Sequence, residues 1–160
     1  MSNPYAPFVS YKQWADRGLC DVAAQNIAKL DAAEAAILLR ILDHIHVVDQ
    51  IFQHHLQGIP HGFAAPRSEK IPDLHALAGS MRKVDAWYAS YVGDRALRDF
   101  EEPVDFVFTS GKSARMTRGE ILLHVCLHGT YHRGNAGLIL LKNGVQPNPD
   151  AVTDFLEAAA

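Results

Sequence analysis

The sequence predicts an all-α fold, a four-helix bundle that carries a small β-hairpin just before its last long helix. Apolar residues recur at helical spacing in four segments of roughly 20 residues or more. Glycine and proline lie between these segments, and Asp or Thr precedes three of them as a helix-start signal. A short stretch rich in valine and phenylalanine, followed by a glycine turn, interrupts the helical pattern once.

The composition describes one domain spanning residues 1–160 and argues against several classes of partner. The net charge of −3 offers no basic face for nucleic acid. No apolar run approaches the roughly 18 residues that a membrane span needs, so we expect neither a nucleic-acid nor a membrane partner. Residues 1–5 show no secretory signal. Two cysteines outside a C-x-x-C spacing indicate reduced thiols and a cytoplasmic location.

Two long helices are expected in the first third of the chain. Residues 6–26 place apolar side chains at helical spacing among charged ones. The second helix, Ala32–Gln57, follows Asp31, which has the spacing of a capping box with Glu34. Residues 58–72 contain three prolines and two glycines, so we interpret them as a loop.

A third helix and a hairpin follow this loop. Asp73 is a suitable N-cap for a helix that ends near Gly93, and residues 94–100 are expected to add a short helical turn. Residues 104–109 and 113–116 have strand character on either side of a turn at Gly111, which predicts the hairpin. After the last long helix, a short terminal helix is expected within residues 150–160.

The last long helix is expected to begin near Arg118. Thr117 and Glu120 have the spacing of a capping box, in which each side chain satisfies a free backbone N–H of the first turn. Asn143 and Gly144 provide the stop signal. Apolar residues fall on nearly every face, so the sequence predicts a central and buried helix.

Three histidines share one face of this helix. His124, His128 and His132 recur at intervals of four, which places each about one turn beyond the last. A single buried histidine is most often a satisfied core residue, but an i, i+4 pair on an apolar helix favours a metal ion. The outer two lie about 12 Å apart along the axis, so all three do not suit one ion. A further ligand must come from another helix.

The second helix supplies that ligand. His44 falls on the same stripe as Ile41 and Val48, whereas His46 points about 200° away. His54 and His55 lie at the helix end, where a solvated surface role is the simpler interpretation. His44 with His128 and His132 is therefore the leading triad, and His124 is the competitor within the last helix.

The chain resembles the DinB/YfiT-like proteins. The segment His128–Gly134 is similar to their H-x-x-x-H-R-G signature. Tyr11–Arg17 resembles their first-helix pattern, and Leu42–Phe52 resembles their second helix. The resemblance covers nearly the whole chain, including the hairpin before the last long helix.

The resemblance implies a four-helix bundle with an up-down-down-up connection, usually a homodimer, with a divalent ion held by three histidines. Carried over by position, these are His44, His128 and His132. His124 lies where relatives often also have histidine, and we assign it to packing or to support of the ligands. Asn135 departs from the glutamine that is common at this position.

A site of three neutral imidazoles suggests an enzyme. It leaves at least one coordination position open, as in catalytic zinc sites, and the ion can activate a bound water or hold a thiol as thiolate. Relatives in the resembled family include thiol-dependent transferases and isomerases. We therefore expect a zinc or nickel enzyme, of S-transferase or hydrolase type, that activates a low-molecular-weight thiol or water against a small electrophile. The weaker candidates for orientation or substrate contact are His124, Asn135, Asp49, Tyr131 and Arg133.

Two other interpretations stay open. The protein can be a metal-binding, stress-associated bundle without turnover, or a structural dimer whose histidines are satisfied core groups. Nothing in the sequence identifies the substrate, because one fold carries many functions.

Overall fold

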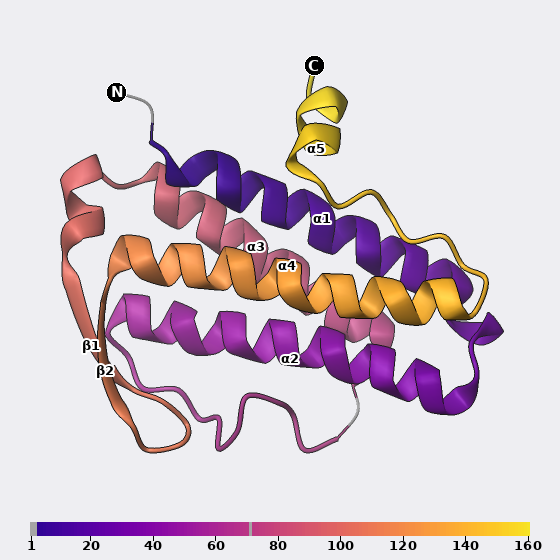
Figure 1. The fold of residues 1–160 in the computed structure, drawn as a ribbon. Coiled ribbons are helices and arrows are strands. Elements are labelled where there is room, and N and C mark those ends of the chain that lie inside the picture. The colour runs from indigo at the N-terminus through magenta and orange to yellow at the C-terminus, as the bar shows by residue number, and fades with distance from the viewer. Residues whose placement is uncertain (1–2, 71) are drawn as a thin grey trace.

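The computed structural model describes residues 3–70 and 72–160. Over these residues the chain is mostly helical, with five α-helices and a two-stranded antiparallel hairpin before the last long helix (Figure 1). Met1, Ser2 and Ile71, which belong to the expected N-terminal segment and loop, lie outside the described residues. None of the helices within the described ranges is long and apolar enough to cross a membrane.

The elements lie close to where the sequence predicts them. The predicted 6–26 helix begins one residue earlier, and the helical turn expected at 94–100 is a 3₁₀ helix. In chain order they are α1 (Tyr5–Asn26), η1 (Ile27–Lys29), α2 (Ala32–Gln57), α3 (Leu74–Gly93), η2 (Leu97–Glu101), β1 (Pro103–Val107), β2 (Ser113–Thr117), α4 (Arg118–Lys142) and α5 (Val152–Ala158).

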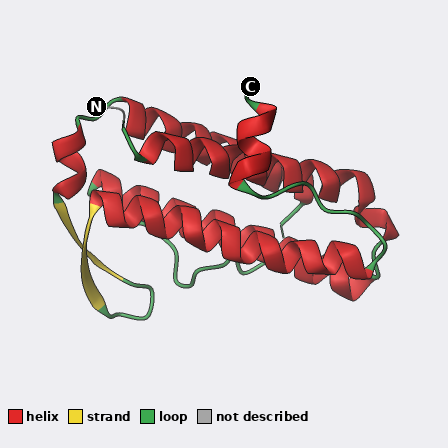
Figure 2. Cartoon of the chain, turned by 45° about the horizontal axis from the view of Figure 1, so that its top comes forward, coloured by secondary structure: helices red, strands yellow, loops and turns green. Residues whose placement is uncertain are grey.

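The four long helices run alongside one another. In Figure 1, α1 and α4 run from left to right, and α2 and α3 run in the opposite direction. Both α1 and α2 contact α3 and α4, so the apolar faces of all four meet in the interior. Figure 2 shows the hairpin at one end of the helices. The core continues beneath it, where Phe106 of β1 packs against Phe52 of α2.

Side-chain caps fix where the long helices begin. Asp73 accepts a hydrogen bond from the Ala76 amide at 3.0 Å, and Thr117 and Glu120 form the predicted capping box. Asp31 caps α2, but the prediction that Glu34 completes a box with it is wrong. The Glu34 carboxylate instead accepts hydrogen bonds from Lys142 and Asn143. This contact ties the start of α2 to the end of α4.

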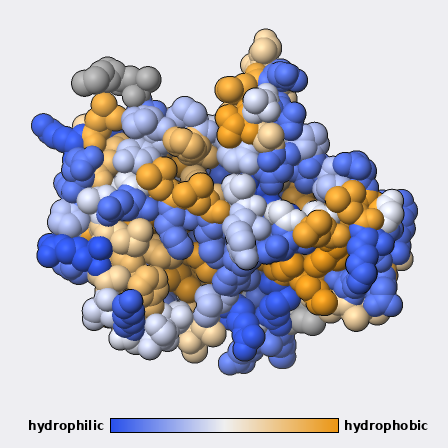
Figure 3. Space-filling view, viewed as in Figure 1, coloured by the Kyte–Doolittle hydropathy of each residue, from blue (hydrophilic) through white to orange (hydrophobic). Residues whose placement is uncertain are grey.

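One face of α4 differs from the prediction of a helix buried all round. Leu127, Tyr131 and Leu138 are 67%, 70% and 66% exposed. Figure 3 shows further apolar surface where the end of α4 passes the start of α2. Ile37 of α2 and Leu141 of α4 are each about half exposed. Apolar surface of this kind is typical of a face that another molecule covers. The homodimer expected from the resemblance stays a prediction.

A buried ammonium group holds three of the long helices together. Lys12 of α1 is 1% exposed, and its Nζ lies 2.6 Å from Asp16, 2.7 Å from Asp49 of α2 and 2.7 Å from Asp85 of α3. Burial lowers the pKa of a lysine, but here these carboxylates more than offset it and raise the Lys12 pKa. The amine therefore stays charged inside the core.

The network continues into α4 through Asp16. This carboxylate accepts a hydrogen bond from Arg133 Nη1 at 2.8 Å, and Arg133 Nε donates to Asp150 at 2.7 Å. Tyr11 also donates to Asp150. We call Lys12, Asp16, Asp49, Asp85 and Arg133 the ionic core. It links all four long helices and anchors the segment that leads to α5.

Replacing Lys12 with methionine should destabilise the protein strongly. The substitution keeps the side-chain length but leaves three buried carboxylates without their shared cation, which costs about 3–5 kcal/mol. Urea denaturation at neutral pH measures the free energy of unfolding. The matched control is Lys83→Met at an exposed position of α3, which should change it by less than about 0.5 kcal/mol. Equal effects of the two substitutions would contradict the role of Lys12.

Candidate metal centre

Three histidines from two helices point their rings at one another. His44 comes from α2, and His128 and His132 come from α4. Each offers a ring nitrogen, and these nitrogens all lie within 4.8 Å of one another. The Nε2 atoms of His44 and His128 are 3.1 Å apart. The group could therefore hold a metal ion.

The helical repeat and the pairing of α2 with α4 produce this arrangement. His128 and His132 are four residues apart on one helix, so they share a face and their ring centroids lie 4.5 Å apart. The antiparallel neighbour α2 places the His44 ring 4.9 Å from His128 and 4.5 Å from His132. The ring planes are inclined to one another by 62°, 81° and 59°, and one nitrogen of each ring joins the converging group.

A backbone carbonyl orients His44. Its Nδ1 lies 2.6 Å from the carbonyl oxygen of Pro66, in the loop between α2 and α3. A carbonyl can only accept, so Nδ1 carries the hydrogen and a neutral His44 has its lone pair on Nε2. Metal-binding histidines commonly donate their other N–H in this way, which fixes the tautomer and the ring orientation.

Burial and the neighbouring rings keep His128 and His132 ready to coordinate a metal ion. Burial, followed by the neighbouring rings of His132 and His44, lowers the pKa of His128 to about 3. Burial and His44 also lower the pKa of His132. Neutral imidazoles keep the lone pair that a metal needs.

The spacing of the His44 and His128 donors fits a divalent ion. Nitrogens about 2.0–2.1 Å from a tetrahedral ion lie roughly 3.3 Å from each other, close to the 3.1 Å between His44 and His128. Three imidazoles suit zinc, nickel, copper and iron, so the donor set does not select the metal.

The other histidines take different places. The His124 ring packs 4.7 Å from Phe52 and 5.6 Å from His128 between centroids, and it is not in the converging group. His46 is buried and bonds to Ser80 of α3. The prediction of a surface role for His55 is wrong, because its ring stacks on Phe106 beneath the hairpin.

The weaker candidates for orientation or substrate contact do not gather around the three converging histidines. Asp49 and Arg133 belong to the ionic core, and their side chains bond to Lys12 and Asp16 of α1 rather than to the histidines. Tyr131 is 70% exposed, with its ring edge-on to His132. Asn135 is half-buried, and its side chain makes no hydrogen bond within the described part of the chain. None of the four joins the converging histidines.

Two cavities adjoin the histidines. One of about 360 Å³ is lined by Ala36, Ile37, Arg40, Ile41, His44 and His132. The other, of about 390 Å³, is lined by Arg40, His44, Ala65, Pro66 and Arg67. Neither arginine was predicted from the sequence as part of the site. Arg40 could have been found, because it lies one turn before His44, but no sequence signal places Arg67 there.

A family model described as the DinB family matches residues 1–160. The chain belongs to the DinB family. The search of curated proteins found no match, and neither did the search of solved structures. DinB membership thus bears out the resemblance carried by the helix patterns and by the segment His128–Gly134.

The histidine group should bind one divalent ion per chain. Untagged protein incubated with Zn²⁺ or Ni²⁺ and then desalted is expected to retain one ion, measured by elemental analysis. His128→Ala should weaken binding at least about tenfold, because two imidazoles do not hold a tight site. His75→Ala, which removes an exposed histidine at the start of α3, should leave the stoichiometry unchanged. Equal retention by the two variants would refute the site.

Asp49 should make stability depend on pH. Burial is the main cause that raises its pKa to about 7, and Asp16 and Asp85 also raise it while Lys12 lowers it. Its Oδ1 is buried without a partner among the described residues. The folded state thus holds a proton that the unfolded carboxyl has lost above about pH 4, so this contribution to stability falls from about pH 4 to 7.

Asp49→Asn cannot titrate at this position. Its free energy of unfolding, relative to wild type, should therefore rise by on the order of 2 kcal/mol between pH 5 and pH 7.5. Taking the difference between the two proteins removes the opposite trend of the buried histidines. Denaturation curves at the two pH values measure it, and a constant difference would show that Asp49 has an ordinary pKa.

Proposed function

We propose that this DinB-family protein is a divalent-metal enzyme that activates a thiol or water for attack on a small electrophile. Zinc or nickel would be held by His44, His128 and His132. The reaction would be of S-transferase or hydrolase type. The observation that carries the proposal is that the three histidines converge beside open cavities rather than inside a closed core.

The number of donors supports a catalytic centre over a purely structural one. Structural zinc sites usually have four protein ligands, whereas catalytic sites have three and an open position. Among the described residues the converging group has three members, none of them a cysteine or a carboxylate. The open side would face the cavities that adjoin His44.

The chain's own thiols are poorly suited to act as the nucleophile. Cys20 and Cys126 are buried, and burial is the main cause that raises the pKa of each to about 12. A thiol nucleophile would therefore come from a small molecule. A bound divalent ion would lower the pKa of water to about 7 or hold a thiol as thiolate. When a thiol adds to an epoxide, the sulfur would bond to a ring carbon and the bond between that carbon and the epoxide oxygen would break. The thiol proton would end on that oxygen.

We also propose that residues 1–160 form one domain with a DinB/YfiT-like four-helix bundle of up-down-down-up connection. The directions of α1 to α4 and the contacts of α1 and α2 with α3 and α4 support it. In such bundles, metal sites are built from side chains of facing helices.

The second candidate is a metal-binding protein without turnover. It is favoured by one observation: the histidines come from α2 and α4, so an ion would join two helices and stabilise the native state by mass action. A rise in melting temperature on metal addition is expected from both candidates.

A measurement of catalytic turnover distinguishes the two candidate functions. The metal-loaded protein is expected to accelerate addition of 2-mercaptoethanol to a small epoxide or hydrolysis of p-nitrophenyl acetate. His128→Ala should lose at least about 100-fold of that rate, because the activating ion is lost. His75→Ala, incubated with the same metal, serves as the control and should keep it. Metal-loaded protein that binds one ion yet matches the rate of free metal in both assays would favour the second candidate.

A further inference from the structure

The loop between α2 and α3 is fastened to α2 beside the histidines. The Pro66 carbonyl accepts the hydrogen bond from His44 described above. Two residues later, the Ser68 amide donates to the Asp43 carboxylate at 2.9 Å, and the Ser68 carbonyl accepts from Arg40 at 2.6 Å. Arg67 therefore lies between two residues whose backbones are bonded to α2.

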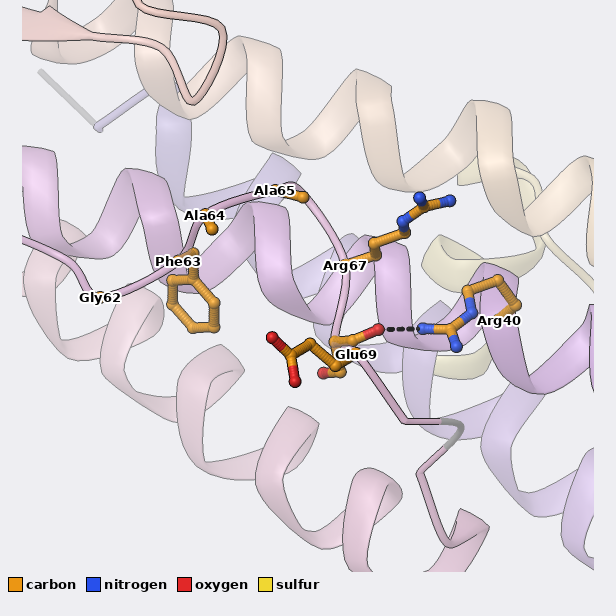
Figure 4. A pocket seen from close by; sticks show the side chains of 8 residues that line it. Arg40, Gly62, Phe63, Ala64, Ala65, Arg67 and Glu69 are labelled. Carbon is orange, nitrogen blue, oxygen red and sulfur yellow. Dashed lines mark hydrogen bonds between the residues drawn. The ribbon is translucent and has the colours of Figure 1, made fainter.

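The two arginines beside His44 differ in how their charge is compensated. Arg40 Nη1 lies 2.9 Å from Asp43, whose carboxylate neutralises it. Arg67 is exposed and has no ion pair or side-chain hydrogen bond among the described residues. Glu69 lines a neighbouring cavity of about 640 Å³ with both arginines. Figure 4 shows the Glu69 carboxylate and the Arg67 guanidinium on opposite sides of the loop, with Arg67 directed toward α4.

The two cavities beside His44 therefore differ in the chemical character of their linings. On one side, Ala36, Ile37 and Ile41 make an apolar surface next to His44 and His132. On the other, Arg67 and His44 line the same cavity. A free guanidinium on a fixed backbone is a planar donor that suits carboxylates and related anions.

We propose that Arg67 recognises an anionic group, carboxylate or sulfonate, on the small molecule that binds at the metal centre. The inference rests on the proposed function and adds a substrate class: a small molecule with a metal-binding group and a negative charge a few bonds from that group. Arg67 is then a specificity-determining residue and not a catalytic one. Arg40 keeps Ser68 in place and contributes no free charge.

Cobalt-loaded protein provides a direct binding test, because a thiolate bound to Co²⁺ gives a charge-transfer absorption. We would titrate 2-mercaptoethanol, 3-mercaptopropionate and 2-mercaptoethanesulfonate. Wild type should bind the anionic thiols about fivefold more tightly than the neutral one, and added salt should weaken this preference. Arg67→Ala should abolish the preference and leave the Kd of 2-mercaptoethanol within about twofold. Arg67→Lys should keep part of it.

The matched control is Arg98→Ala. Arg98 lies in η2, and its side chain is 90% exposed, so all three Kd values should stay as in wild type. An equal preference in wild type and Arg67→Ala would overturn the anion site while leaving the proposed function intact.

If no thiol changes the spectrum, the thiol part of the proposed function is wrong. The same comparison is then made with acetohydroxamate and N-hydroxysuccinamate. Both bind metals through the hydroxamate group, and the second carries an added carboxymethyl group with its negative charge. A preference for the carboxylate that is lost in Arg67→Ala would support the anion site on its own. No preference, or no binding of either hydroxamate, would overturn it.

Discussion

The ionic core is the interaction on which the rest of the structure depends. The buried ammonium of Lys12 contacts carboxylates from three helices. One of these carboxylates, Asp16, also bonds to Arg133 on the fourth helix. Desolvating such charges is costly, and removing one partner would leave the others buried and uncompensated. Apolar packing alone tolerates sliding, whereas these short contacts fix how α4 lies relative to α1, α2 and α3.

His128 and His132 are adjacent in sequence to residues that pack against the ionic core or belong to it. Gly129 follows His128, and a Cβ there would lie 3.0 Å from Arg133 Nη1 and 3.6 Å from Lys12 Cε. Glycine thus lets α4 approach the ionic core closely. Arg133 itself follows His132. The polar interior therefore sets the rotation of α4, and this rotation turns both histidines toward His44.

Much of the fold and part of the site could be predicted from sequence. Caps and glycines mark the helix ends, and the four-residue spacing of histidines marks one face. The ionic core was not predicted, since Lys12 and Asp16 are charged residues in an amphipathic pattern, and such residues usually lie on the exposed face of a helix. Yet they fall on its buried stripe with Val9, Ala15 and Leu19, which is a signal that could have been used. The Pro66 carbonyl carries no such signal, because a backbone group reaching α2 from a loop leaves no residue-type pattern.

The three histidines come from two helices that are far apart in the sequence, which determines how a bound ion would act on the unfolded chain. His44 and His128 are 84 residues apart in sequence, so an ion held between them would close more than half of the polypeptide into a ring. Such a crosslink restricts the unfolded ensemble as a disulfide does, and the effect grows slowly with ring size. Unlike a disulfide, it would form without an oxidant and open whenever a chelator removed the ion. Metal supply would then contribute to the free energy of unfolding of the chain.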